Sequence, residues 1–145
     1  MEAVFIRLGE GEQLEVGPDG RFELLGSAGD SEIGAAVARV APGMQTIPPH
    51  FHRNHAEAIF VLGGELEMTL GEKTVTADAG CLALIPAGVA EGVHHAGGEP
   101  ATFLEVYAPS GFEQFLRELA QRLPRDQFEP ELMEEIGQRH DVIRA

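Results

Sequence analysis

The sequence lacks several features that would tie it to a membrane or to an oxidising compartment. It has one cysteine, Cys81, and no tryptophan among 145 residues, so an internal disulfide is excluded. No stretch approaches the ~20 consecutive apolar residues that cross a bilayer, and the start of the chain lacks the basic segment of a secretory leader. These absences predict a cytoplasmic protein with no membrane partner.

Basic residues are scarce as well. Ten Lys and Arg stand against 24 Asp and Glu, which gives a net charge of −14. Because this charge repels phosphate backbones, nucleic acid is not an expected partner. With 43% hydrophobic residues the chain can bury one sizeable core without disulfides, so we expect a single domain over residues 1–145.

The sequence does contain a series of short apolar or alternating runs separated by glycine-rich turns. The runs lie near residues 4–8, 13–16, 21–25, 33–40, 47–52, 57–62, 65–70, 73–77, 82–85, 89–94 and 101–107. Their length and spacing are typical of an all-β sandwich or barrel, and no helical period interrupts them. We expect a β-barrel over about residues 1–108.

The hydrophobic period changes after residue 108. Ser110 and Glu113 match a capping box, and apolar residues then recur on one helical face as far as Leu123. Pro130 is placed to begin a second helix. The sequence thus predicts one or two α-helices within a segment of about 110–140, which would cover an edge or end of the barrel.

The stretch PPHFH at residues 48–52, followed by Glu57, is the candidate site. Alternate residues on a strand face the same side about 6.6 Å apart, so His50 and His52 can converge on one ion. Glu57 opens the next run, and the intervening turn can bring its carboxylate back to the two rings. Two imidazoles and one carboxylate suit iron, zinc or manganese. Taken alone, His-x-His also fits ordinary polar residues at an exposed strand end.

Over a longer range the pattern resembles the two signature motifs of the cupin superfamily. Gly43, His50, His52 and Glu57 follow the first motif, although six residues rather than five separate Gly43 from His50. GCLALIPAG, at residues 80–88, follows the first half of the second motif. Three further stretches are similar to the small single-domain bacterial cupins described as quercetin-dioxygenase-like: FELLGSAGDSEIGAAVARVAPG, GGEPATFLEVYAP and SGFEQFLREL. The resemblance therefore covers nearly the whole chain.

The resemblance implies a jelly-roll β-barrel that forms a homodimer and holds a divalent metal ion inside the barrel. The implied metal ligands are His50, His52 and Glu57, and the ion is iron, manganese, zinc or nickel. A small-molecule ligand bound beside the ion is implied as well.

The match breaks at position 91, where the family has a fourth histidine ligand and this sequence has Glu91. His95 stands where asparagine is usual. On a regular strand His95 shares the face of Glu91 but lies about 13 Å along it, and His94 points the other way, so neither replaces the missing ligand without a bulge. Three interpretations of Glu91 stay open: a second carboxylate ligand, a general base beside the ion, or a sign that metal binding has been lost.

Strand alternation predicts which side chains surround the site. The expected inward positions are Ile59, Val61, Met68 and Leu84, which would form an apolar cavity beside the metal. His55, in the turn between the two ligand-bearing runs, is expected at the surface.

The functional hypothesis is a metal-binding cupin whose metal ligands are His50, His52, Glu57 and Glu91. In one version it is a metal-dependent dioxygenase-type enzyme acting on a small enol or phenolic compound, with Glu57 or Glu91 taking the substrate proton. In another it is a non-catalytic module that binds or senses a small molecule. A cupin isomerase acting on a sugar or keto acid is the third version, because polarising a carbonyl needs the same ligands. The sequence does not decide whether the protein is an enzyme.

Overall fold

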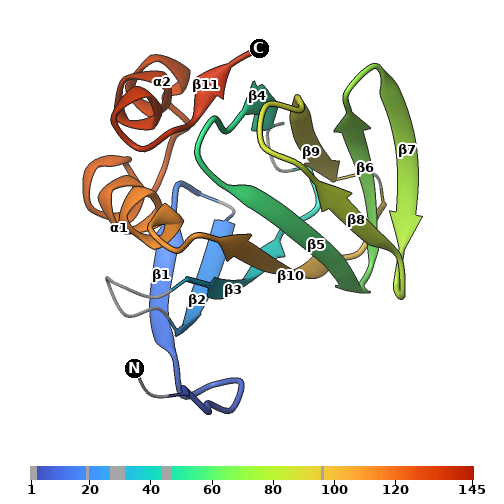
Figure 1. The fold of residues 1–145 in the computed structure, drawn as a ribbon, viewed down its shortest axis with the longest axis horizontal. Helices are drawn as coiled ribbons and strands as arrows, with labels where there is room; N and C mark the ends of the chain where they lie inside the picture. The colour runs from blue at the N-terminus through green and yellow to red at the C-terminus, as the bar shows by residue number, and fades with distance from the viewer. Residues whose placement is uncertain (1–2, 19, 27–31, 44–46, 96) are drawn as a thin grey trace.

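The computed structural model describes residues 3–18, 20–26, 32–43, 47–95 and 97–145, whose regular secondary structure is mainly β-strand (Figure 1). The elements in chain order are β1 (Glu12–Val16), β2 (Gly20–Gly26), β3 (Gly34–Val40), β4 (Ile47–Phe51), β5 (Ala56–Gly63), β6 (Glu65–Leu70), β7 (Lys73–Asp78), β8 (Leu82–Ile85), β9 (Glu91–His95), β10 (Ala101–Ala108), α1 (Phe112–Arg122), α2 (Pro130–Arg139) and β11 (Ile143–Arg144). The predicted all-β fold with C-terminal helices is confirmed.

The segment at residues 4–8 was predicted as a strand, and that prediction is wrong. It forms no strand, and its apolar side chains Val4, Phe5 and Leu8 are exposed. This segment has no neighbouring strand among those described, and the six-stranded sheet ends at β1 instead. An apolar run without such a neighbour has no ladder to satisfy its backbone groups.

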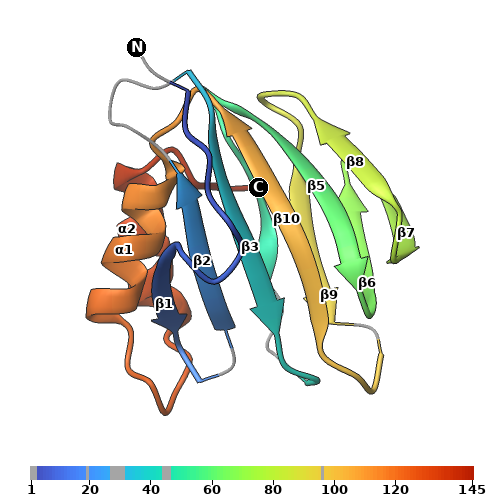
Figure 2. The same ribbon diagram turned by 90° about the horizontal axis from the view of Figure 1, so that it is seen from below.

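The strands form two antiparallel sheets that face each other across the core (Figure 2). One sheet has the order β1-β2-β3-β10-β5-β8 and the other the order β11-β4-β9-β6-β7. Neighbours from distant parts of the chain, such as β3 with β10 and β4 with β9, give the jelly-roll arrangement. No hydrogen-bonded ladder joins the two sheets among the described strands. The fold is therefore a two-sheet sandwich and not the closed barrel that the sequence predicts.

Side chains that alternate inward along the strands fill the space between the sheets. The buried residues include three of the four predicted at inward positions, namely Ile59, Val61 and Met68. Leu84 is 74% exposed, so the prediction that it points inward is wrong. In the register of β5 with β8, Ile85 pairs with the buried Glu57 and shares its face, and Leu84 therefore faces outward.

The two C-terminal helices bridge one open side of the sandwich (Figure 1). α1 packs on β1 and α2 packs on β11, which are edge strands of the two sheets. The residues that α1 buries include Phe112, Phe115, Leu116 and Leu119. Neither helix, within the part of the chain described, has the length and apolar character needed to cross a membrane.

α1 begins one residue later than the capping-box pattern predicts. Its N-cap is Gly111, which has a φ of 134° and no capping side chain, so Ser110 is not the cap. The Glu113 carboxylate accepts a hydrogen bond from the backbone N–H of Gly111 at 2.8 Å. The hydrogen bond from the cap backbone N–H to the glutamate of the predicted capping box is therefore present, but its donor is Gly111 instead of Ser110. The backbone conformation of Gly111 disfavours other residues.

Candidate functional site

Three potential metal ligands meet where β4 lies beside β9. His50 on β4 is the register partner of Glu91 on β9, and His52 follows directly after the end of β4. Each residue offers one ligand atom, and these atoms all lie within 4.8 Å of one another. His52 and Glu91 are buried and His50 is half-buried. The antiparallel pairing thus brings together three of the four predicted metal ligands.

Backbone carbonyls fix the orientation of both histidine rings. His50 Nδ1 lies 2.9 Å from the carbonyl oxygen of Pro48, and His52 Nδ1 lies 2.7 Å from that of Asp141. A ring nitrogen facing a carbonyl oxygen donates its proton, which leaves a lone pair on Nε2 of the neutral ring. Metal-binding histidines are held in this way.

Two buried atoms at the centre of the site form no hydrogen bond of accepted geometry in the described chain. His52 Nε2 is 3.0 Å from Glu91 Oε1, yet within the described residues neither atom has a hydrogen bond of acceptable geometry. Burial lowers the affinity of His52 for a proton, but Glu91 and Glu57 outweigh it and raise the pKa of His52. The site therefore attracts positive charge at the point where these lone pairs converge. A divalent ion that accepts nitrogen and oxygen donors, such as iron, manganese, zinc or nickel, fits this donor set.

Glu57 lies next to this set of three but is not one of its members. Its Oε1 is 3.3 Å from His52 Nε2 and 3.1 Å from His55 Nε2. Burial, followed by the charge of Glu91, raises the pKa of Glu57 to about 8. In the metal-free protein this carboxyl therefore holds a proton at neutral pH, and it is placed to exchange one with a group bound beside it.

His55 is buried, so the prediction that it lies at the surface is wrong. It is 7% exposed, its ring stacks on that of His52 with centroids 4.0 Å apart, and its Nδ1 is 3.1 Å from Asp141 Oδ2. Burial lowers the pKa of His55 despite the Asp141 carboxylate. The three groups Asp141, His55 and Glu57 form a continuous polar chain beside His52, and the ligand atoms of His52, His55 and Asp141 also lie within 4.8 Å of one another.

Asp141 joins the end of the chain to the histidine loop. Its carboxylate accepts hydrogen bonds from the backbone N–H groups of Arg53 and Asn54, both at 2.8 Å, in addition to its contact with His55. Burial would raise the pKa of Asp141, but these hydrogen bonds outweigh it and lower the pKa. A residue 86 positions from His55 therefore determines how the loop is folded.

We expect Asp141→Ala to lower the free energy of unfolding by roughly 2 kcal/mol, because several hydrogen bonds to a charged group are lost together. Urea unfolding measures this change. Asp126→Ala is the control, since Asp126 is exposed and its replacement should change stability by less than about 0.5 kcal/mol. Equal effects of the two substitutions would contradict the assignment of Asp141 as a structural anchor.

The histidines of β9 do not supply a further metal ligand within the described residues. His94 lies on the face opposite Glu91, and its Nε2 is 3.7 Å from Glu67 Oε1 across the β6–β9 pair. The side chain of His95 lies outside the described residues. Position 91 is therefore occupied by a buried carboxylate, and His94 does not replace the missing histidine.

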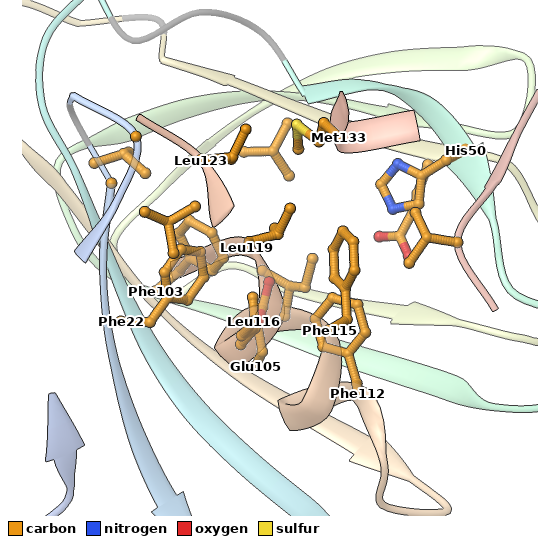
Figure 3. Close-up of a pocket in the computed structure, with 18 of the residues that line it drawn as sticks. Phe22, His50, Phe103, Glu105, Phe112, Phe115, Leu116, Leu119, Leu123 and Met133 are labelled. Carbon is orange, nitrogen blue, oxygen red and sulfur yellow. The ribbon is translucent and has the colours of Figure 1, made fainter. Parts of the chain in front are cut away.

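A cavity of about 110 Å³ lies beside the candidate ligands, between the two sheets and α1 (Figure 3). Its polar lining side chains are His50, Glu57, Glu91 and Glu105, and most of the others are aromatic or aliphatic. Sequence reasoning missed Glu105. The alternation of buried residues along β10 puts it on the inward face, and this signal was available in the sequence.

The central part of the chain matches a known family. A family model described as a cupin domain matches residues 36–107, a span that contains all of the candidate ligands and Glu105. No curated protein matches the chain.

Solved structures share the fold at low sequence identity. KdgF from Halomonas sp. has a TM-score of 0.69 at 16% identity, covering 78% of this chain and 99% of that one. A predicted oxalate decarboxylase from Thermotoga maritima has a TM-score of 0.66 at 20% identity, covering 74% and 100%. A sugar phosphate isomerase from a cupin superfamily, from Silicibacter pomeroyi, has a TM-score of 0.61 at 24% identity, covering 74% and 77%. At these identities the likeness shows the fold alone. Residues 36–107 thus match a cupin domain, and the two-sheet fold is the one that these solved structures share.

Proposed function

We propose that this protein is a metal-dependent enzyme of the dioxygenase type that acts on a small enol or phenolic compound in the cavity. The observation that carries the proposal is the pair of buried atoms His52 Nε2 and Glu91 Oε1, 3.0 Å apart and without hydrogen-bond partners in the described chain. Two electron-rich atoms held this close are unfavourable unless a proton or a metal ion lies between them. A divalent ion there would be held by His50, His52 and Glu91.

Such an ion would supply Lewis acidity toward the substrate oxygen and, when redox-active, a route for electrons to dioxygen. The residues around it have separate tasks. The carbonyls of Pro48 and Asp141 hold the two imidazoles in the orientation that ligation requires. Apolar side chains of α1 exclude water from the cavity. Glu57 accepts the proton of the enol or phenol, because positive charge beside it lowers its raised pKa.

A second candidate function is isomerisation of a hydroxy- or keto-compound. The observation that favours it is the chain Glu57–His55–Asp141, in which Glu57 Oε1 is 3.1 Å from His55 Nε2. Moving a proton between two carbons of a substrate needs a base that can take the proton and return it. One of the solved structures above is a sugar phosphate isomerase.

Metal analysis of protein purified without added metal tests the first step. We expect about one equivalent of a divalent transition metal in the wild-type protein and less than about a tenth of that in His50→Ala, because one of three ligands is lost. His94→Ala is the matched control, since its ring lies on the opposite face of β9 and the metal content should not change. A wild-type protein that stays free of metal after incubation with Mn²⁺, Fe²⁺ and Zn²⁺ would contradict the proposal.

Substrate assays then separate the two candidate functions. Oxygen uptake on flavonols, diketones or catechols, lost in His50→Ala, would support the dioxygenase. Incorporation of deuterium from D₂O into keto acids or sugar phosphates, without oxygen uptake, would support the isomerase. A metal-loaded protein that binds these compounds and changes none of them would instead indicate a binding module.

A further inference from the structure

Glu105 is a buried carboxylic acid that the metal-binding proposal does not use. It lies on β10 between Phe103 and Tyr107, which face inward with it, and it is 8% exposed. Its Cα partners are Ala36 on β3 and Ile59 on β5, so apolar residues flank it on both neighbouring strands. Its Oε2 has no hydrogen-bond partner in the part of the chain described. A buried polar atom without a partner is unfavourable, so it calls for an explanation such as a bound water, ion or ligand.

The cavity is the space that this atom can face. Glu105 is one of the lining residues, and Figure 3 shows it among leucine and phenylalanine side chains, apart from His50 at one end. Leu116 and Leu119 of α1 line the same cavity. Within the described lining there is no Lys or Arg that could pair with the carboxyl. The cavity therefore has two polar regions, His50 with its neighbouring carboxylates and Glu105, separated by apolar walls.

The surroundings of Glu105 favour its neutral form. Burial raises its pKa well above the usual value, and the charges of Glu57 and Glu91 raise it further. A neutral carboxyl donates one hydrogen bond through its O–H group and can also accept one. Such a group suits an uncharged oxygen on a ligand better than an ammonium group, which would require the ionised form.

We propose that Glu105 is a second anchor in the cavity, which hydrogen-bonds a hydroxyl or carbonyl oxygen of a small ligand whose other oxygen lies at the His50–His52–Glu91 end. A cavity on the order of 150 Å³ holds one benzene ring, so the 110 Å³ here leaves room inside for no more than one ring. The inference deepens the proposed function by naming a substrate class: one-ring compounds with two oxygens on separate parts of the molecule. It rests on the cavity being the ligand site, and the contact itself does not require the metal.

Three compounds of nearly equal shape test the anchor: 4-ethylphenol, 4-(hydroxymethyl)phenol and 4-(aminomethyl)phenol, together with their 3-substituted isomers. We measure their dissociation constants by calorimetry and ligand-observed NMR on the full chain as purified. In the wild-type protein we expect the hydroxymethyl compound of at least one isomer series to bind more tightly than its ethyl and aminomethyl counterparts. The reason is that a site built around a hydrogen bond discriminates against a ligand that cannot form it.

Substitutions at Glu105 assign the preference to its carboxyl group. Glu105→Met keeps a similar length without a polar atom, and we expect the ratio of the ethyl to the hydroxymethyl dissociation constant to fall at least fivefold. Glu105→Gln still donates and accepts hydrogen bonds, and it should keep the ratio within about threefold of the wild-type value. Leu84→Met, on the exposed outer face of β8 and outside the lining of the cavity, is the control and should also keep the ratio. Far-UV circular dichroism checks that each variant is folded. If Glu105→Met does not fold, Glu105→Gln still tests the anchor.

Several outcomes would overturn the anchor. One is an unchanged ratio of dissociation constants in Glu105→Met, and another is a ratio in Glu105→Gln that falls as far as it does in Glu105→Met. The wild-type protein would also contradict the anchor if it bound the aminomethyl compounds most tightly or bound none of the compounds. Metal content is measured in the same samples. If the preference for the hydroxymethyl compound survives in metal-free His50→Ala, the anchor is supported separately from the metal. If the wild-type protein binds no metal but keeps this preference, only the proposed function is contradicted.

Discussion

Metal-free protein is expected to become less stable as the pH rises from about 6.5 to about 8, mainly because of Glu57. Burial, followed by the charge of Glu91, raises the pKa of Glu57 from 4.5 to about 8. In the unfolded chain this carboxyl has an ordinary pKa and is already ionised across that range. The folded protein therefore holds a proton that the unfolded chain has lost, and the free energy of unfolding falls as the pH rises through about 8.

The other titratable groups of the site determine the pH range in which the effect of Glu57 on stability can be measured. Glu105 and His52 also have raised pKa values, so the stability linked to them is likewise lost as the pH rises through those values. His50 and His55 have lowered pKa values, mainly through burial, and act in the opposite direction, because the unfolded chain binds their protons more tightly. Their opposing effect is largely complete above pH 6.5, the ordinary pKa of histidine. Above that pH the raised pKa values decide the trend.

Urea unfolding in the presence of a chelator, at several pH values between 6.5 and 8, measures the effect. We expect a fall of roughly 2 kcal/mol across this window, since one proton held only by the folded state corresponds to about 1.4 kcal/mol per pH unit. Glu57→Gln removes the titrating group and should make the slope clearly shallower. With saturating Zn²⁺ the trend should reverse, because the ion competes with protons for the ligands. Wild-type, metal-free protein that gains stability from pH 6.5 to 8 would contradict the burial of Glu57.

Features set by local pattern could be predicted from the sequence. Turn residues at regular spacing predicted most of the strands, and the inward positions of Ile59 and Met68 followed from alternation. The proximity of His50 and His52 followed from their spacing on the chain. The position of Glu91 beside them could not be derived in this way, since it depends on the register of β4 with β9. Only the resemblance to a family had indicated position 91.

The errors have a common physical origin, which is pairing between distant segments. The run that contains Leu84 is apolar throughout and does not itself show which face is inward, so the register of β8 against β5 decides the face of Leu84. His55 was placed at the surface because turns usually lie there, yet Asp141 and the ring of His52 bury it. Glu105 is a different case. Phe103, Glu105 and Tyr107 share a face in any strand over this run, so a charged residue in the core could have been predicted.

Glu91→Gln is expected to weaken metal binding on the order of 100-fold or more, whereas Glu57→Gln should weaken it by less than about tenfold. Removing groups that only orient metal ligands typically costs 10- to 100-fold in affinity, so losing a ligand should cost at least as much. The ligand atom of Glu91 lies within 4.8 Å of those of both His50 and His52. Glu57 instead holds a proton at neutral pH in the metal-free protein, and metal binding through it would first require release of that proton.

In activity measurements we expect the opposite order, with a strong loss in Glu57→Gln, because the amide of this variant cannot accept the substrate proton. Once a substrate is found, metal-loaded Glu57→Gln should lose roughly 10²- to 10⁴-fold in kcat, the range associated with a general base. Titration with Mn²⁺ or Co²⁺, followed by calorimetry and by the spectrum of the bound ion, measures the affinities independently of turnover. His94→Gln serves as the control for both measurements. If Glu57→Gln loses the ion and Glu91→Gln keeps it, the ligand set implied by the family motif is the right one, and Glu91 becomes the candidate base.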